Sequence, residues 1–338
     1  MKKTYYIYYS VLTILIGILI TMLIVAGAQW ISKHFTHKVT TFPVKNIDTN
    51  AEAVAEENAG ATGASQESLE SLTPAVSLLT GAKGTTPITA PEYIVETLGG
   101  ISPHTNAFVA GNSVIDQKDA DRSVPIASLT KLVTAVVADN LIDRTTIINI
   151  GPRVLATYSG NTAKLVDGEQ ISAHDLLYPL LMTSSNDAAE ALALTYGKKA
   201  FVKAMNDWVY SIGAYHTYFA EPTGLSSENI SSATDIFTIL NWIYINRPDL
   251  IAITTTKVKT VGFHTWVNPA HLLNLTAYIG GKDGYTPEAG LTAATLFAIT
   301  TDGKHQIIAV IVLCSTNRDR DVLGLIDRIG TNVMTLNK

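Results

Sequence analysis

The stretch VPIASLTKLVTAVVA, residues 124–138, contains a predicted helix start. It also contains Ser128 and Lys131, two side chains between which a proton can pass. Pro125 stops any helix upstream and an apolar run with helical periodicity follows, so we expect Ser128 at or near a helix N-terminus. Ser128 and Lys131 are three residues apart and would share one face of that helix. A buried lysine with a lowered pKa can serve as the general base for a serine hydroxyl. On spacing alone, a capping serine followed by a surface lysine explains the same stretch.

Two further motifs follow along the chain. Ser184-Ser185-Asn186 ends one apolar helical pattern and opens another; here a serine can relay a proton, and an asparagine can hold a lysine and a substrate carbonyl. Lys282-Asp283-Gly284 precedes a predicted hairpin, where a lysine at a sheet edge can hold an anionic substrate end and a glycine lets a substrate backbone approach. Taken alone, each motif also suits a structural role, the first as a capped turn between helices and the second as a glycine-rich lead into the hairpin.

Residues 87–338 are patterned as one folded domain. Strand patterns cover residues 107–115, 291–300 and 307–314, and a turn at Asp302-Gly303 predicts a hairpin from the last two. Helical periodicity is present in six segments, at residues 129–141, 173–181, 188–196, 201–212, 233–245 and 320–334. An early strand, central helices and a late hairpin with a terminal helix indicate an α+β fold, whose sheet combines distant parts of the chain.

The N-terminus carries the most apolar segment. Residues 5–32 contain no charged residue, and residues 11–28 read VLTILIGILITMLIVAGA, close to the length of about 20 residues that spans a bilayer as a helix. Ala26-Gly27-Ala28 also fits a cleavage site, so a cleaved signal peptide is the alternative. We favour a membrane anchor over residues 1–32, which predicts a single-pass protein of the cell membrane with its folded domain outside the cytoplasm.

Residues 33–86 are predicted to form a flexible, acidic stalk. Residues 46–86 are rich in Ala, Glu, Ser, Thr and Gly, with Lys83 as their only lysine or arginine and no aromatic residue. Such a segment buries too little apolar surface to offset the entropy lost on ordering.

The overall composition excludes several classes of protein. Of the 338 residues, 47% are hydrophobic and 16% are charged, which excludes a wholly disordered chain. A net charge of −5 offers no basic face for nucleic acid. Cys314 is the only cysteine and the histidines form no ligand pattern, so we expect neither a disulfide framework nor a metal site.

The three motifs occur in the order S-x-x-K, S-x-N and K-x-G, a set shared by penicillin-binding proteins and class A β-lactamases. From about residue 107 onward, the chain resembles the serine D-Ala-D-Ala carboxypeptidases, the low-molecular-mass penicillin-binding proteins. Segments outside the motifs are similar too: Asp167-Gly168-Glu169, Asp175-Leu176-Leu177, Met205-Asn206, Glu221-Pro222-Thr223-Gly224-Leu225 and Ala289-Gly290.

The resemblance implies a fold of the β-lactamase and transpeptidase type, with an antiparallel sheet flanked by helices, an all-α subdomain and a site between them. It implies a peptidoglycan pentapeptide as substrate, β-lactams as inhibitors, and no metal or organic cofactor. The implied site consists of the nucleophile Ser128, its base Lys131, Ser184 and Asn186 on one wall, and Lys282, Asp283, Gly284 and Tyr285 on the other. The backbone N–H groups of Ser128 and Tyr285 would form the oxyanion hole.

One residue departs from the family pattern. The third motif usually has threonine or serine at its centre, where the hydroxyl donates to the substrate carboxylate, and this chain has Asp283. An ionised aspartate only accepts hydrogen bonds, and it repels a second carboxylate. We therefore expect weaker binding of a free terminal carboxylate and weaker acylation by β-lactams.

Two alternatives remain open from the sequence. A class A-like β-lactamase is one, because Glu221 follows Asn186 at about the distance of a deacylating glutamate. A catalytically altered or inactive homologue that binds cell wall is the other, because of Asp283.

Overall fold

The computed structural model describes residues 89–90, 92–98, 100–101, 108–109, 113–156, 162–301 and 304–329, all within one compact unit that spans residues 58–338. The predicted anchor (residues 1–32) and stalk (33–86) lie outside the described residues and stay predictions. Within the described part, none of the helices has both the length and the apolar character needed to span a bilayer.

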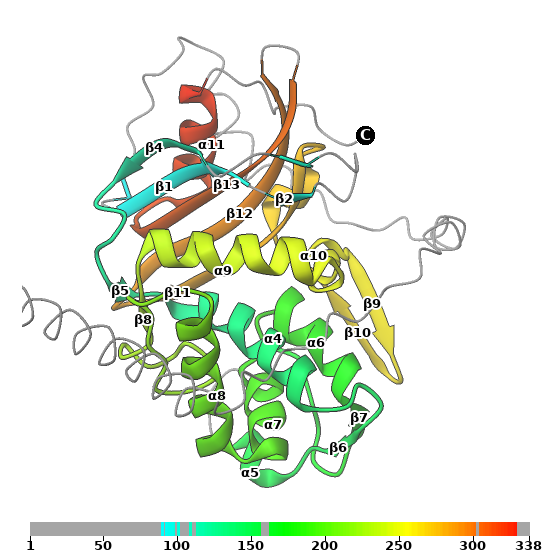
Figure 1. Cartoon of the computed structure of the whole chain (residues 1–338). Helices are drawn as coiled ribbons and strands as arrows, with labels where there is room; N and C mark the ends of the chain where they lie inside the picture. Colours follow the sequence, from blue (N-terminus) through cyan, green and yellow to red (C-terminus); the bar gives the residue numbers. More distant parts are fainter. Residues whose placement is uncertain are drawn as a thin grey trace, which may run out of the picture. The chain divides into compact units, whose positions relative to one another are not determined.

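A five-stranded antiparallel sheet carries one wall of the site. Its strand order is β11-β12-β13-β1-β4, so strands from the two ends of the domain lie side by side (Figure 1). The strands are β1 (Glu92–Thr97), β4 (Ser113–Lys118), β11 (Tyr278–Thr286), β12 (Gly290–Thr301) and β13 (Lys304–Ser315). The predicted hairpin is confirmed, with Ala294 of β12 opposite Ile311 of β13 and Thr301 opposite Lys304.

Helices cover both faces of the sheet. On one face, Ile308, Val310 and Val312 of β13 share a core cluster with Val322 and Leu325 of α11 (Arg318–Arg328). Because side chains alternate along a strand, residues such as Ile311 point to the other face, where α9 (Ala233–Asn246) contacts β13 and β1. Burial on both faces explains why residues 307–313 of β13 form a continuous apolar run.

The helical part is built around α4 (Thr130–Leu141). Residues 130–138 of this helix are all buried, because α6, α7, α8 and α9 surround it. Three of these helices are α6 (Ala173–Met182), α7 (Asn186–Tyr196) and α8 (Lys198–Ser211), and α10 (Pro248–Thr255) packs on α6 and α9. A helix that is apolar on all sides belongs at the centre of such a bundle.

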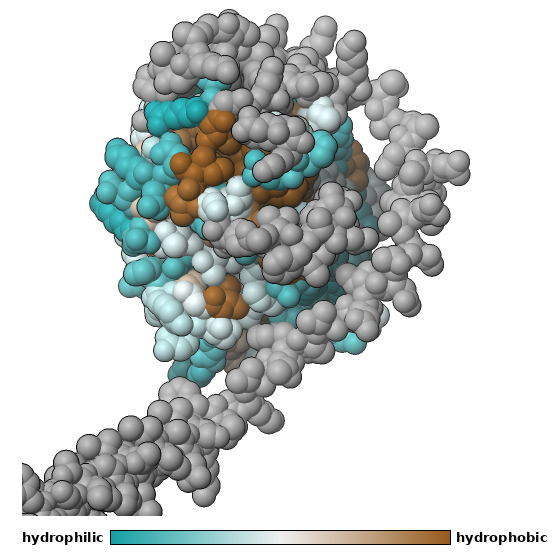
Figure 2. Space-filling view, turned by 45° about the horizontal axis from the view of Figure 1, so that its top comes forward, coloured by the Kyte–Doolittle hydropathy of each residue, from teal (hydrophilic) through white to brown (hydrophobic). Residues whose placement is uncertain are grey.

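Short elements complete the fold. They are η1 (Ala127–Leu129), α5 (Pro152–Leu155), η2 (His271–Asn274), and the two-stranded pairs β2 (Gly100–Ile101) with β3 (Phe108–Val109), β5 (Val124–Pro125) with β8 (Ile230–Ser231), β6 (Ile147–Asn149) with β7 (Gln170–Ser172) and β9 (Val258–Val261) with β10 (His264–Val267). On the face shown in Figure 2, hydrophobic residues form patches among polar ones rather than a continuous surface.

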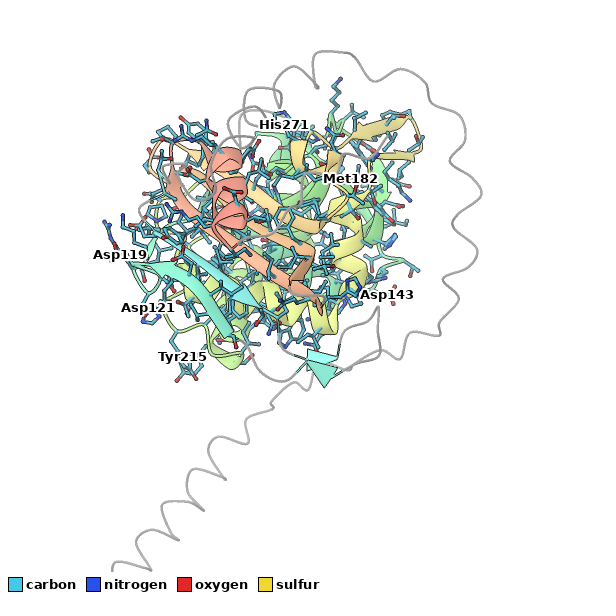
Figure 3. All side chains as sticks on the ribbon, turned by 90° about the horizontal axis from the view of Figure 1, so that it is seen from above. Asp119, Asp121, Asp143, Met182, Tyr215 and His271 are labelled. Atoms are coloured by element: carbon cyan, nitrogen blue, oxygen red, sulfur yellow. The ribbon has the colours of Figure 1, made fainter. Side chains whose placement is uncertain are left out.

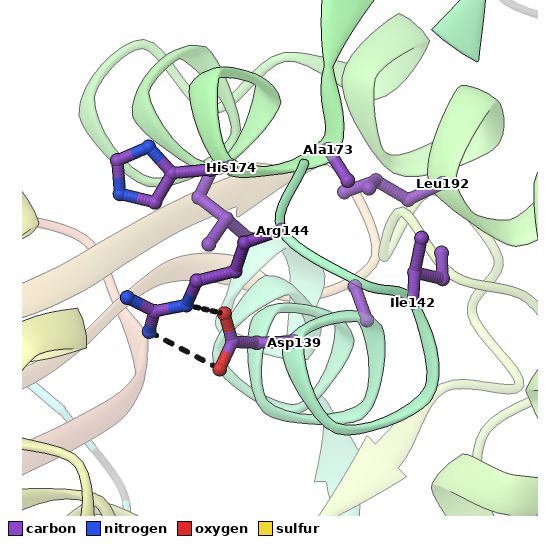
Figure 4. A pocket seen from close by; sticks show the side chains of 8 residues that line it. Asp139, Ile142, Arg144, Ala173, His174 and Leu192 are labelled. Carbon is purple, nitrogen blue, oxygen red and sulfur yellow. Dashed lines mark hydrogen bonds and ion pairs between the residues drawn. The ribbon is translucent and has the colours of Figure 1, made fainter. Parts of the chain in front are cut away.

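A charged cluster ties the central helix to the junction of α9 and α10. Asp139 of α4 accepts hydrogen bonds from Arg144 and Arg247, and both arginines also pair with Asp249. The Asp139–Arg144 pair lies beside a small space of about 150 Å³, lined otherwise by apolar residues and His174 (Figure 4). Two carboxylates and two guanidiniums balance in charge, so we interpret this cluster as structural.

Several predicted elements differ from those in the structure. The strand predicted at residues 107–115 is split, since residues 108–109 pair with β2 and the sheet strand β4 begins at Ser113. The last helix covers Arg318–Arg328, and residues 330–334 of the prediction lie outside the described residues. Strand β1 and helix α10 were not predicted as such, because Glu92 and Glu96 interrupt the apolar pattern of the first and the second is only eight residues long.

Candidate active site

Ser128 lies in the 3-10 turn η1, directly before α4, as the helix-start prediction indicated. Its backbone is held from several sides. Thr292 Oγ1 donates to the carbonyl of Ile126 (3.2 Å), and the backbone N–H of Ile126 donates to the carbonyl of Asn229 (3.1 Å). Ala127 has φ +48°, a conformation that costs energy in a residue with a Cβ. The surrounding contacts therefore impose the position of Ser128.

Two glycines allow the chain to approach Ser128 closely. A Cβ on Gly224 would lie 2.0 Å from the carbonyl oxygen of Ala127, and a Cβ on Gly284 would lie 2.7 Å from the backbone nitrogen of Ser128. Gly284 thus brings β11, the edge strand of the sheet, against the serine. Gly224 brings a loop against it from the helical part.

Lys131 is the centre of the polar contacts at this site, and its side chain is fully buried. Its Nζ lies 3.0 Å from Ser128 Oγ, 2.9 Å from Asn186 Oδ1 and 2.5 Å from the carbonyl oxygen of Thr223. Burial, and then the nearby positive charge of Lys282, lower the pKa of Lys131 to about 7, although Glu221 and Asp283 act in the opposite direction. A large fraction of Lys131 is therefore neutral, and can accept a proton, near neutral pH.

The loop that supplies the Thr223 carbonyl is organised by Glu221. The Glu221 carboxylate accepts from the backbone N–H groups of Thr223 (2.7 Å) and Gly224 (2.6 Å), from Thr223 Oγ1 (2.6 Å) and from Asn229 Nδ2 (3.0 Å). With its oxygens used in this way, Glu221 is not placed as a free base for a deacylating water. This geometry gives no support to the β-lactamase alternative.

Ser184 and Asn186 come from the turn between α6 and α7. Ser185 caps α7, since its hydroxyl accepts from the backbone N–H of Ala188 (3.1 Å), and this fixes Asn186 in the first turn. Ser184 has φ +59°, and its hydroxyl oxygen is buried without a hydrogen-bond partner among the described residues. A buried unsatisfied hydroxyl is costly, so this group is suited to meet a substrate.

Strand β11 forms the opposite wall. Lys282 is buried, and its Nζ donates to the backbone carbonyl of Asp283 (2.7 Å) and to Asp283 Oδ1 (3.2 Å). The other carboxylate oxygen, Oδ2, lies 2.9 Å from Nη1 of Arg318, the first residue of α11. The side chain of Tyr285 is exposed, so its suggested role depends on its backbone N–H.

The structure therefore brings Ser128 and Asn186 into contact with Lys131 and places Gly284 against Ser128. Lys282 and Asp283 are close enough to influence the pKa of Lys131. Arg318 and the Thr223 carbonyl lie outside the three motifs. Thr223 lay in the segment EPTGL that was singled out for its similarity, but no local pattern indicated which atom would meet the lysine.

Comparison with known proteins identifies the family. The family model described as D-alanyl-D-alanine carboxypeptidase matches residues 109–316. The chain belongs to this family. The resemblance inferred from the motifs is thereby confirmed.

The relatives include D-alanyl-D-alanine endopeptidases and D-alanyl-D-alanine carboxypeptidases. A D-alanyl-D-alanine endopeptidase of Pseudomonas aeruginosa is 38% identical over 190 residues, which cover 52% of this chain and 60% of the relative. An endopeptidase of Escherichia coli K12 is 40% identical over 167 residues (45% and 53%). The D-alanyl-D-alanine carboxypeptidase DacD of Salmonella typhimurium is 31% identical over 210 residues (58% and 53%). The chain thus spans between half and three fifths of the length of these relatives.

Solved structures support the fold. A D-alanyl-D-alanine carboxypeptidase from Mycobacterium tuberculosis superposes with a TM-score of 0.61 at 24% identity, over 74% of this chain and 96% of that one. A mutant of the Streptomyces K15 DD-transpeptidase gives 0.60 at 24% identity, over 72% and 97%. The predicted α+β fold, with an antiparallel sheet flanked by helices, is confirmed, while its predicted transmembrane helix lies outside the described residues.

Proposed function

We propose that this chain is a serine D,D-peptidase that acts on peptidoglycan stem peptides and removes the terminal D-Ala through an acyl-enzyme on Ser128. The observation that carries the proposal is the 3.0 Å contact between Ser128 Oγ and a fully buried Lys131. Family membership and the names of the relatives supply the substrate class.

The contacts of Lys131 favour its action as a base. A neutral amine has two N–H donors and one lone pair. Asn186 Oδ1 and the Thr223 carbonyl oxygen are acceptors only, so they can take the two N–H groups. The lone pair is then left for the hydroxyl of Ser128, and the amine is oriented for proton abstraction.

The reaction follows from this arrangement. Ser128 Oγ attacks the carbonyl carbon of the penultimate D-Ala while its proton passes to Lys131 Nζ. The backbone N–H groups of Ser128 and Tyr285 are proposed to stabilise the oxyanion. The peptide C–N bond then breaks, and its nitrogen takes a proton from Lys131 through the Ser184 hydroxyl. A water molecule finally attacks the ester, gives a proton to the same base and frees Ser128.

The N-terminal segment suggests where this reaction takes place. We propose that residues 1–32 anchor the protein in the cell membrane and that residues 33–86 hold the catalytic domain away from it, outside the cytoplasm. The uncharged, apolar run at residues 11–28 supports the anchor, and peptidoglycan lies on that side of the membrane. Protease treatment of intact spheroplasts tests this, since digestion of the domain only after lysis would contradict it.

The test of the catalytic proposal uses the full-length protein in detergent with a pentapeptide muropeptide. We expect release of D-Ala and a transient ester on Ser128 detectable by mass spectrometry, both absent in Ser128→Ala. The control is Ser227→Ala, because Ser227 is exposed and belongs to another S-x-N sequence, Ser227-Glu228-Asn229. D-Ala release that persists in Ser128→Ala would disprove the assignment of the nucleophile.

A further inference from the structure

Lys282 and Arg318 form a cationic wall of the site, and both already bind the carboxylate of Asp283. Lys282 and Arg318 would both be suited to bind the terminal carboxylate of a peptide. Each is paired with Asp283, through Lys282 Nζ to Oδ1 (3.2 Å) and Arg318 Nη1 to Oδ2 (2.9 Å). Asp283 thus occupies the place in which a substrate carboxylate would be expected to bind.

Asp283 stays ionised in this environment. Burial alone would raise the pKa of its carboxyl group, but the charges of Lys282 and Arg318 outweigh burial and lower the pKa to about 2. Arg318 is also paired with Asp319, through Nε and Oδ1 (3.2 Å). The two cations of this wall therefore face two carboxylates of the protein, and no excess positive charge remains to attract a third.

The wall instead offers a donor beside an acceptor. Asp283 presents carboxylate oxygens, which accept. Lys282 has three N–H donors, and two of them donate to Asp283, so one remains for a ligand. An amide has the complementary pair, an N–H group and a carbonyl oxygen. A free carboxylate has acceptors only, so it would place negative oxygens against those of Asp283.

A cleft continues past this wall. It is open to solvent and is lined by Met182 at the end of α6, by Asn268 and His271, and by Lys282, Asp283 and Arg318 among others. Figure 3 labels Met182 and His271 on the same side of the molecule. Because the cleft opens to solvent, a group attached to the carboxyl end of a terminal D-Ala can extend outward from this wall.

We infer that the leaving-group side of this site selects a residue whose carboxyl group is an amide, in preference to a free C-terminal carboxylate. The amide is either a primary carboxamide or the next peptide bond of a longer chain, and both have the same donor and acceptor pair. Asp283 is the residue that determines this specificity. The inference rests on the proposed D,D-peptidase function and narrows its substrate class.

The experiment uses full-length protein and three matched peptides, an N-acylated L-Lys-D-Ala-D-Ala with a C-terminal free acid, primary amide or methylamide. We expect wild type to cleave at least one amide with a kcat/KM about tenfold above that of the acid, and Asp283→Thr to reverse this ratio. A ratio in wild type below threefold, or one that Asp283→Thr leaves unchanged, would overturn the inference. A faster methylamide indicates a continuing peptide, and a faster primary amide indicates an amidated end.

Two further variants make the result specific. Asp283→Asn preserves the shape of the side chain and is expected to reduce the discrimination, which covers the case in which Asp283→Thr fails to fold. Asp319→Asn removes a carboxylate that pairs with Arg318 only, and is expected to weaken the preference for amides less than Asp283→Thr does. A loss of that preference in Asp319→Asn equal to that in Asp283→Thr would contradict a specific role of Asp283.

The proposed function is measured separately in the same samples. An ester on Ser128 with any of the three peptides supports a D,D-peptidase, whichever peptide is preferred. If none of them acylates Ser128, the proposed function fails and the inference fails with it.

Discussion

The Nζ of Lys131 lies 2.9 Å from Oδ1 of Asn186, a residue 55 positions further along the chain. This contact joins the first turn of α7 to the central helix α4. Because Asn186 and the Thr223 carbonyl both accept from Lys131, the orientation of the amine depends on two segments remote from it in sequence. Four predictions follow from this network and its supports.

Asn186→Ala removes one of the two acceptors that orient Lys131. We expect acylation of Ser128 to slow by about tenfold to a hundredfold, which corresponds to the loss of a hydrogen bond to a charged or buried group. Stopped-flow acylation by a fluorescent penicillin measures the rate. An unchanged rate in a folded variant would show that the Asn186 contact does not orient the base.

The pH dependence of acylation reports the ionisation of Lys131. The base must be neutral, and the pKa of Lys131 is about 7 because of burial and then the charge of Lys282. The acylation rate is therefore expected to rise with pH below about 7 and to level off above it. Asp283 stays ionised throughout, since its pKa is about 2, so it adds no second transition near neutral pH. A rate that falls as pH rises from 6 to 8 would contradict the role of Lys131 as base.

Gly224→Ala tests the close approach of the loop to Ser128. The new Cβ would lie 2.0 Å from the Ala127 carbonyl oxygen, so we expect both lower stability and loss of acylation. The matched control is Gly213→Ala, because Gly213 also has φ +89° but has no atom within 4 Å of the Cβ position. That control carries only the backbone strain, about 1 kcal/mol or somewhat more, and should still be acylated. Urea unfolding and penicillin labelling compare the two; equal effects would mean that backbone strain alone explains the glycine.

Glu221→Gln separates a supporting role from a hydrolytic one. The Glu221 carboxylate accepts hydrogen bonds within its own loop, and that loop presents the Thr223 carbonyl to Lys131. We expect slower acylation and no increase in the lifetime of the acyl-enzyme. Mass spectrometry over time after penicillin treatment measures that lifetime. Accumulation of a long-lived acyl-enzyme in Glu221→Gln alone would restore the β-lactamase alternative.

Elements with regular apolar periodicity were predictable from sequence, and less regular ones were not. The helix at 233–245 and the hairpin of β12 and β13 match because their packing faces are nearly uninterrupted. Strand β1 lies inside the sheet, between β13 and β4, yet it contains Glu92 and Glu96. Glu92 is accommodated by its ion pair with Arg122 (2.6 Å), a contact that has no signature in the local pattern.

In the candidate site, the motif residues were predictable from the sequence, and their long-range partners were not. Ser128, Lys131, Ser184, Asn186 and Lys282-Asp283-Gly284 were recognisable because their spacings are short and their order is that of the family. The partner of Asp283 was not recognisable, since Arg318 lies on the last helix of the described chain and meets β11 only in the folded domain. The sequence predicted repulsion of a substrate carboxylate by Asp283, and the structure adds that the two nearest cations are already paired with it.

The residue pattern alone predicts a helix start at Ser128 and places Lys131 one turn later, because helical geometry relates residues that are three apart. The proposed role of this lysine as a base depends on the folded domain. Its pKa depends on complete burial and on the charges around it, and its orientation depends on the Thr223 carbonyl, 92 residues away in the chain. Burial and long-range contact arise when the sheet and the helices pack together, so the local spacing of a motif does not contain them.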